Sequence, residues 1–161
     1  MITIAMSAVI GAPRERVWDA LTVPVEMARW DLRLLSIQEG PARASEPLEV
    51  GDHIRARYRM GAVPIGYTLR VLTTTPRSRI DTAVSLGLFR FRETSILTDE
   101  SRTQTRIALR LAAPNAMPVV GGVIDRFDVR KMAAERVDER LQALRVWCED
   151  ALPAALPSSP A

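Results

Sequence analysis

Apolar and polar residues alternate along the middle of the chain, and this pattern restricts the fold more than any other feature of the sequence. In residues 53–60, HIRARYRM, the residues Ile54, Ala56 and Tyr58 alternate with basic residues. Successive side chains of a β-strand point to opposite faces of a sheet, so the pattern predicts a strand with one buried and one wet face. Similar segments separated by turn residues together indicate an antiparallel sheet. The expected strands cover residues 2–10, 35–40, 53–60, 65–72, 80–86, 89–99 and 104–111.

Three segments instead have the three- and four-residue spacing of apolar residues that is typical of amphipathic helices. Proline suits the first turn of a helix, and short helices are expected at residues 13–22 and 24–30, each opening with a proline. The third helix is expected from Pro118 to Asp150, which would make it roughly 50 Å long. Its apolar stripe comprises Val120, Ile124, Phe127, Ala134, Val137, Leu141, Leu144 and Cys148.

The composition excludes several functional classes. Cys148 is the only cysteine and His53 the only histidine, so the chain has neither an internal disulfide nor a thiolate metal cluster. The net charge is +3, and every basic residue except Lys131 and His53 is an arginine. No element that reads nucleic acid accompanies these charges. The apolar start lacks the basic region of a signal peptide, and no apolar run approaches the roughly 18 residues of a membrane span. The cytoplasm is therefore the expected compartment.

Arginine recurs on the polar face of the predicted sheet. Arg55 and Arg57 lie on this face in one strand, and Arg92 lies on it in another. One interpretation is an ordinary solvated face with charged protection of the sheet edges. The other is a docking face for an acidic partner, such as an acyl carrier protein or an anionic lipid surface.

The apolar face of the sheet has one unexpected member, the carboxylate of Glu93. In residues 89–99, FRFRETSILTD, strict alternation places Glu93 on the same face as Phe89 and Phe91. Tyr58 and Tyr67 share that face from other strands. A β-bulge before Glu93 would turn the carboxylate outward instead. Without a bulge, Glu93 is a buried acid that needs a cation or a hydrogen-bond donor beside it.

The order of these elements, together with three segments, resembles the START-like superfamily, also called SRPBCC, which includes the birch-pollen allergen. The segments are APRERVWDALTVPVEMARW (residues 12–30), LEVGDHIR (48–55) and RVDERLQALRVWCED (136–150). Within the superfamily the chain looks most like the bacterial polyketide cyclase/dehydrase branch. The resemblance implies an α+β helix-grip fold over residues 1–150, in which a curved antiparallel sheet wraps a long C-terminal helix around an apolar cavity. Residues 151–161 are expected to be a disordered tail.

The resemblance implies a hydrophobic small molecule as ligand, but it carries no catalytic motif shared by all branches. The resemblance also implies cyclase or aromatase activity, as in some members of the superfamily. From the residues we predict that this reaction is an aldol-type cyclisation or dehydration that needs no metal or organic cofactor. Glu93 would act as acid and base, and Tyr58 and Tyr67 would donate hydrogen bonds to the developing oxyanion. The predicted ligand-binding residues are Trp30, Phe89, Phe91, Leu69, Ile107, Phe127, Arg130 and Lys131.

Alternative interpretations stay open at this point. Arg130 or Lys131 could anchor a carboxylate or phenolate of the substrate, or could simply form a buried ion pair with Glu93. The protein could also be a carrier or sequestering protein for a lipid or natural product, or a co-chaperone-like interaction domain. Fold membership does not decide among these functions, and the sequence leaves both a monomer and a homodimer open.

Overall fold

The computed structural model describes residues 1–119 and 122–151. The predicted tail, residues 151–161, lies outside this range except for its first residue. In chain order the elements are β1 (Ile2–Ile10), α1 (Arg14–Thr22), α2 (Pro24–Trp30), β2 (Leu34–Glu39), β3 (His53–Met60), β4 (Val63–Thr75), β5 (Arg79–Leu86), β6 (Phe89–Asp99), β7 (Thr105–Ala113), β8 (Met117–Val119), β9 (Gly122–Ile124) and α3 (Arg126–Ala151).

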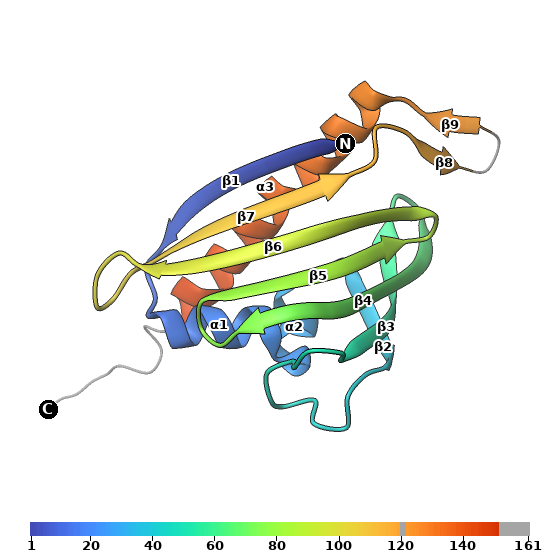
Figure 1. The fold of residues 1–161 in the computed structure, drawn as a ribbon. Helices are drawn as coiled ribbons and strands as arrows, with labels where there is room; N and C mark the ends of the chain where they lie inside the picture. Colours follow the sequence, from blue (N-terminus) through green and yellow to red (C-terminus); the bar gives the residue numbers. More distant parts are fainter. Residues whose placement is uncertain (120–121, 152–161) are drawn as a thin grey trace, which may run out of the picture.

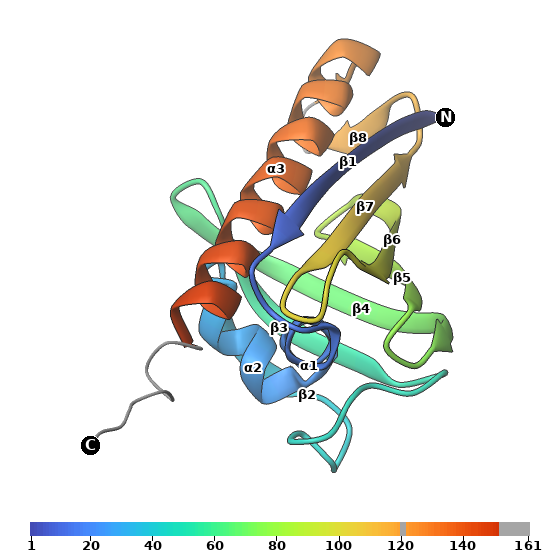
Figure 2. The same ribbon diagram turned by 90° about the vertical axis from the view of Figure 1, so that its left-hand side faces the viewer.

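The main sheet has seven antiparallel strands in the order β1-β7-β6-β5-β4-β3-β2. It is strongly curved, and α3 lies along its inner face while α1 and α2 pack at one end (Figures 1 and 2). β8 and β9 form a separate two-stranded hairpin that projects beside the start of α3 (Figure 1). The predicted helix-grip architecture is confirmed.

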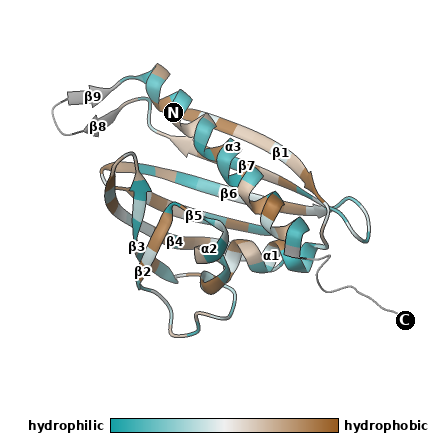
Figure 3. Ribbon diagram, turned by 180° about the vertical axis from the view of Figure 1, so that it is seen from behind, coloured by the Kyte–Doolittle hydropathy of each residue, from teal (hydrophilic) through white to brown (hydrophobic). Residues whose placement is uncertain are grey.

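The core lies between the inner face of the sheet and α3. Figure 3 shows hydrophobic residues, in brown, along α3 and along the strands that it covers. Along α3, buried side chains recur at three- and four-residue steps, so one stripe of the helix faces the sheet. The apolar residues of this stripe are Val129, Ala133, Val137, Leu141, Leu144 and Cys148. The alternating strands supply the opposite wall with every second residue.

The long helix begins later than its apolar periodicity predicts. Residues 117–119 and 122–124 are strands, and α3 starts at Arg126 rather than at Pro118. Asp125 caps this start, because its Oδ1 accepts the backbone amides of Phe127 (2.9 Å) and Asp128 (3.1 Å). The glycine at position 122 also has a low helix propensity. The expected first two turns are therefore wrong.

No helix among the described residues is long and apolar enough to cross a membrane. The expectation that residues 1–150 form a single domain stays a prediction, because a test of it would show whether this segment folds on its own.

We predict that truncating the centre of the α3 stripe destabilises the fold. Leu144 has no exposed surface, and replacing a buried leucine by alanine removes contacts and leaves a cavity. Leu144→Ala should lower the free energy of unfolding by about 2–5 kcal/mol, measured by urea denaturation. Val146→Ala is the matched control, because Val146 is 58% exposed on the same helix. Its effect should stay within about 0.5 kcal/mol, and an equal loss in both variants would contradict the assigned helix face.

Candidate ligand-binding cavity

A cavity of about 200 Å³ lies between the first half of α3 and the inner face of the sheet. Its walls come from β3, β5, β6, β7 and α3, and from Arg33 just before β2. The lining residues are Arg33, Tyr58, Arg59, Met60, Leu86, Phe89, Phe91, Leu111, Ala113, Val129, Met132, Ala133, Glu135, Arg136 and Glu139. The inner wall is mostly apolar. Of the charged members, Arg59, Glu135 and Glu139 are exposed, Arg33 is half-buried and the side chain of Arg136 is largely buried.

The size of the cavity limits what it can enclose. An apolar cavity of about 150 Å³ holds a benzene molecule, so about 200 Å³ suits one substituted ring. Phe89 and Phe91 come from β6 and Leu86 from β5, next to the tight turn at Gly87, where φ is +61°. Glycine accepts this φ without strain, and the turn sets the two phenylalanines beside the cavity.

The buried carboxylate of Glu93 is bound by an arginine that the sequence interpretation missed. β6 pairs with β5 and β7 without a register shift through Glu93, so strict alternation holds and the side chain points inward. Arg136 of α3 donates from Nε to Glu93 Oε1 at 2.6 Å. The same guanidinium donates from Nη1 to the hydroxyl oxygen of Tyr58 at 2.8 Å. Glu93, Arg136 and Tyr58 thus form a chain from the centre of the sheet to the cavity wall.

A second arginine, one helical turn further along α3, extends this network. Arg140 donates from Nη1 to Asp31 Oδ2 at 2.9 Å, and its Nε lies 3.5 Å from Glu93 Oε2. Its guanidinium also lies over the ring of Trp30, 5.0 Å from the centroid. The buried set contains two carboxylates and two guanidiniums, so it is electrically balanced.

The charges fix the protonation of this network. Burial would raise the pKa of Glu93, but the guanidiniums of Arg136 and Arg140 outweigh burial and hold that pKa below its ordinary value of 4.5. Burial raises the pKa of Tyr58 above its ordinary value of 10.0. At neutral pH, Glu93 is therefore a carboxylate and Tyr58 a neutral phenol that can donate a hydrogen bond.

Two donors of the network lack a hydrogen-bond partner among the described residues: Nε of Arg140, which lies only in ion-pair range of Glu93, and Nη2 of Arg136, which belongs to a residue of the cavity lining. Nη2 of Arg136 is buried and has no hydrogen-bond acceptor in the described part of the chain. The guanidinium packs between the rings of Tyr58 and Phe91, with centroids at 5.5 and 5.0 Å. An unsatisfied buried donor costs about 1–3 kcal/mol, so a ligand oxygen that reached this group would bind favourably.

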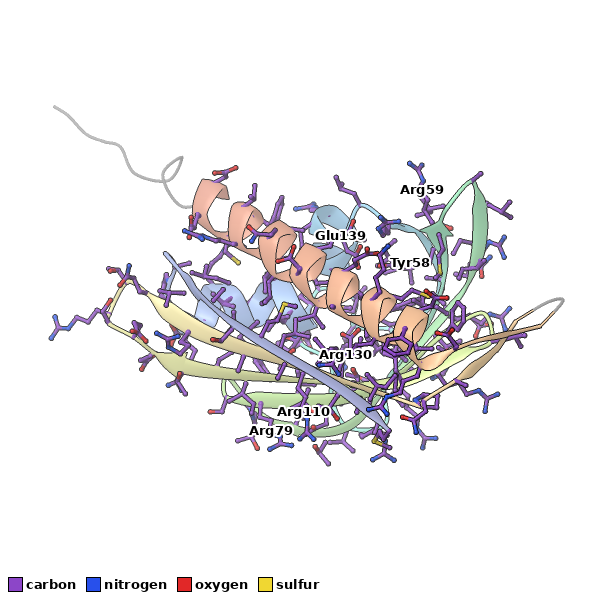
Figure 4. The ribbon with its side chains drawn as sticks, turned by 90° about the horizontal axis from the view of Figure 1, so that it is seen from above. Tyr58, Arg59, Arg79, Arg110, Arg130 and Glu139 are labelled. Atoms are coloured by element: carbon purple, nitrogen blue, oxygen red, sulfur yellow. The ribbon has the colours of Figure 1, made fainter. Side chains whose placement is uncertain are left out.

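Charged residues surround the opening of the cavity. Arg33 donates from Nε to Glu139 Oε1 at 2.7 Å and from Nη1 to the backbone oxygen of Arg59 at 3.2 Å. This ion pair joins the β2 side of the opening to α3. Tyr58, Arg59 and Glu139 lie together at this end, on the α3 side of the sheet (Figure 4).

The structure separates the predicted site residues into three groups. Tyr58, Phe89 and Phe91 line the cavity. Five more are buried in the core away from it: Tyr67 stacks on Tyr58 with centroids 5.4 Å apart, Glu93 lies behind Arg136, Trp30 donates from Nε1 to the backbone oxygen of Ala20, and Leu69 and Ile107 pack in the sheet. Tyr67 is thus placed to position Tyr58 rather than to touch a ligand. The third group lies on α3.

Three predicted contacts on α3 are wrong. Phe127 is 81% exposed, and Arg130 and Lys131 are exposed as well. The prediction drew the inward stripe through Phe127 and Ala134, so that it passed between Arg130 and Lys131. In the structure, Val129 and Ala133 take the inward positions instead. The depth of Glu93 could have indicated Arg136 and Arg140, because a carboxylate at mid-strand needs a partner from the middle of the helix.

We predict that neutralising Glu93 destabilises the protein, because it leaves two buried guanidiniums with one carboxylate. Glu93→Gln should lower the free energy of unfolding by about 3–5 kcal/mol at neutral pH. Glu46→Gln is the control, because it removes a carboxylate from an exposed ion pair with Arg43 and should cost at most about 1 kcal/mol.

The effect of Glu93 also has a predicted pH dependence. The pKa of Glu93 is lower in the folded than in the unfolded state. The carboxylate therefore stabilises the protein fully at pH values above about 4.5, and this stabilisation is lost as the pH falls toward the pKa of the folded state. The difference in unfolding free energy between wild type and Glu93→Gln should therefore shrink in acid. A difference that stayed constant from neutral pH to pH values well below 4.5 would contradict this assignment.

No group of three or more potential metal ligands occurs among residues 1–119 and 122–151. The cavity and its arginine–tyrosine pair are thus the candidate site.

Comparisons with known proteins agree with the fold. A START superfamily protein from Mycobacterium smegmatis is similar with a TM-score of 0.76 and 12% sequence identity, over 92% of this chain and 98% of that chain. The Zhui aromatase/cyclase from Streptomyces sp. R1128 is similar with a TM-score of 0.69 and 16% identity, over 98% of this chain and 99% of that chain. Protein CV1439 from Chromobacterium violaceum is similar with a TM-score of 0.66 and 20% identity, over 91% of this chain and 97% of that chain. Among curated proteins there is no significant match.

The family comparison covers almost the whole chain. The model described as "Polyketide cyclase / dehydrase and lipid transport" matches residues 1–149. The chain belongs to the polyketide cyclase/dehydrase and lipid transport family.

Proposed function

We propose that this protein encloses a hydrophobic, ring-containing small molecule in the cavity beside α3 and promotes its aldol-type cyclisation or dehydration. Membership of the polyketide cyclase/dehydrase family supports a polyketide-like ligand. The observation that carries the proposal is the pair of hydrogen-bond donors at an otherwise apolar wall, Tyr58 and Arg136.

The direction of the hydrogen bonds makes Tyr58 a donor toward the cavity. Its oxygen accepts from Arg136 Nη1, so its own proton is free for another acceptor. The positive charge of Arg136 polarises the phenol and strengthens this donation. A ligand carbonyl facing Tyr58 would therefore be polarised, and an enolate oxygen formed from it would be stabilised.

The balanced charges favour a neutral oxygen over an anion. Arg136 and Arg140 are already compensated by Glu93 and Asp31. A buried carboxylate of a ligand would add an uncompensated negative charge, which is costly at this depth. A ketone or a neutral phenol needs only a hydrogen bond. The sequence suggested Arg130 or Lys131 as an anchor for a substrate carboxylate. We propose instead that the cavity binds a carbonyl group.

Glu93 is better suited to a positioning role than to proton transfer. Its two oxygens face two guanidiniums, its lowered pKa makes it a weak base, and it does not line the cavity. Glu135 does line the cavity, and no ion pair engages it within the described part of the chain. In the proposed reaction Glu135 takes a proton from a carbon next to one carbonyl, and the enolate carbon attacks a second carbonyl. The resulting alkoxide takes the proton back from Glu135. The carboxylate then removes a second proton from the same carbon while the hydroxyl leaves as water, which gives the ring its double bond.

We predict that the cavity distinguishes three probes with the same heavy-atom skeleton: acetophenone, α-methylstyrene and benzoate. One net hydrogen bond is worth about 0.5–1.5 kcal/mol, so acetophenone should bind about three- to tenfold more tightly than α-methylstyrene. Benzoate should bind less tightly than acetophenone. Tyr58→Phe should remove most of the preference for the ketone while keeping the affinity for α-methylstyrene. Ligand-observed NMR or calorimetry measures these affinities.

Each result of the probe series bears on a different claim. Equal affinities for acetophenone and α-methylstyrene would contradict the role of Tyr58, and a preference for benzoate would contradict the charge argument. Phe89→Ala is the matched control, since it alters the cavity wall without touching the donors and should weaken all three probes alike.

Catalysis itself predicts turnover of a simple model substrate. A linear diketone whose carbonyls are separated by three methylene groups closes to a cyclohexenone with loss of water, which is followed by ultraviolet absorbance. Wild type should accelerate this closure, and Tyr58→Phe and Glu135→Gln should each reduce the rate by about 10²-fold or more. Unchanged rates in both variants would reject the assigned roles.

A carrier or sequestering protein is the second candidate, and a specific observation favours it. Glu93, a carboxylate buried next to the cavity wall, is neutralised by arginines, and an ion pair joins Arg33 and Glu139 across the cavity lining. A carrier would retain its ligand through purification, so native mass spectrometry would show a bound species of a few hundred daltons with no accompanying turnover. An empty protein that closes the diketone would reject this candidate.

Two further predictions accompany the proposal. An acidic carrier protein, of the acyl carrier kind, would present a polyketide-like substrate, and the cytoplasm would be the compartment.

A further inference from the structure

The outer face of the sheet, opposite α3, has a row in which arginine and alanine alternate from strand to strand. Arg70 of β4 pairs with Ala83 of β5, Ala83 pairs with Arg92 of β6, and Arg92 pairs with Ala112 of β7. Neighbouring strands lie about 4.8 Å apart, so the backbones at Arg70 and Arg92 are about 10 Å apart. The alanine between them leaves a trough with an arginine on each side.

More arginines extend this trough on the same face. Arg90 lies two residues before Arg92, and Arg110 pairs with Thr94 across β6 and β7. Together with Arg70, Arg79 and Arg92 they line one hollow of about 840 Å³ on the outer face. Figure 4 shows Arg79 and Arg110 on the side of the sheet away from α3. We call these five residues the outer arginine surface.

The outer arginine surface lacks compensating charge. Its one carboxylate, Asp81, is bound by Arg79 at 2.8 Å and accepts hydroxyl hydrogen bonds from Thr73 and Thr94. Within the described residues, the other four arginines form no ion pair. Exposed arginines elsewhere, such as Arg43 and Arg106, do pair with glutamates.

The uncompensated charge accounts for the charge of the whole protein. Five arginines and one aspartate give this surface a net charge of about +4, while the entire chain carries +3. The rest of the molecule is therefore close to neutral. Like charges this close repel one another, so an anionic partner relieves a cost that the free protein carries.

We infer that the outer arginine surface docks an acidic helix of a partner protein. An α-helix with its side chains is about 10–12 Å across, which matches the width of the trough between Arg70 and Arg92. Glutamates or aspartates on the two flanks of such a helix would reach the arginines on either side. Guanidinium and carboxylate groups form paired, charge-assisted hydrogen bonds that give the contact a defined geometry.

The surface fits other anionic partners less well. Outward-facing positions of β4, β5, β6 and β7 carry no aromatic residue on which a nucleic-acid base could stack. A planar membrane would not fill a hollow, and among the outward positions of β4, β5, β6 and β7 that line it, Leu72 is the one large apolar side chain of the kind that inserts into lipid. The sheet separates this surface from the cavity, so the inference goes beyond the proposed function and does not depend on it.

Charge reversal in the intact protein tests the inference. The probe is a fluorescent alanine-based helical peptide with glutamates in one row on each flank of one helix face, and the measurement is fluorescence anisotropy at low salt. Wild type should bind it, with affinity falling as salt is added, and a glutamine version of the peptide should not bind. Arg70→Glu combined with Arg92→Glu should weaken binding by about tenfold or more.

The matched control has the same charge change at another place. Arg29→Glu combined with Arg102→Glu alters exposed arginines on α2 and in the β6–β7 loop, outside the hollow. It should keep at least half of the wild-type affinity. If the double glutamate variant fails to fold, judged by circular dichroism and acetophenone binding, the double glutamine variant Arg70→Gln, Arg92→Gln replaces it.

Three results would overturn the inference. They are failure of the acidic peptide to bind wild type, equal loss of affinity in the test and control variants, and stronger binding of phosphatidylglycerol vesicles or duplex DNA than of the peptide. Loss of peptide binding with retained acetophenone binding would leave the cavity proposal intact, so the two can fail separately.

Discussion

The buried ion network between α3 and the sheet is the interaction that determines how the helix sits in this fold. Apolar packing brings α3 onto the sheet, but a stripe of small and aliphatic residues tolerates several rotations of a helix. Arg136 and Arg140 remove that freedom, because Glu93 and Asp31 lie at fixed points on β6 and beside α2. Moving the helix by one residue rotates it by about 100° and would leave four buried charges unpaired. The network specifies the position of the helix more than it adds to the net stability of the fold, because the attraction within a buried ion pair is roughly offset by the cost of desolvating its charges.

The same network creates the polar end of the cavity. Glu93 orients Arg136, Arg136 orients the hydroxyl of Tyr58, and Tyr67 supports the Tyr58 ring from behind. Each group is held by another buried group, so the donors facing the cavity are preorganised before a ligand arrives. Such preorganisation is what makes a donor effective toward a developing oxyanion. The carboxylate among the phenylalanines of β6 thus serves the site without touching the ligand.

The sequence predicted the sheet well because alternation is a local and redundant signal. All seven strands of the sheet were expected, and strict alternation in β6 correctly placed Glu93 inside. The start of α3 was missed, because apolar residues continue before it while the cap at Asp125 depends on a single side chain. A separate error, the inward placement of Phe127, shifted the helix phase and selected Arg130 and Lys131 in place of Arg136 and Arg140. Ion pairs across 43 positions of sequence leave no periodic trace, so only the depth of Glu93 in its strand pointed to them.

The two faces of the sheet treat arginine in opposite ways, and this contrast separates structural from functional charge. Inside, each guanidinium meets a carboxylate, because an unpaired charge at that depth would destabilise the fold. Outside, water solvates Arg70, Arg90, Arg92 and Arg110, so the fold requires no partner for them. Solvation alone explains why these arginines are tolerated on the surface. It does not explain why the net positive charge of this one hollow exceeds the net charge of the whole chain. Scattered charge would keep the protein equally soluble, whereas clustered charge attracts anions to one place. The buried arginines therefore serve the fold and the cavity, and the exposed ones form a surface suited to recognition.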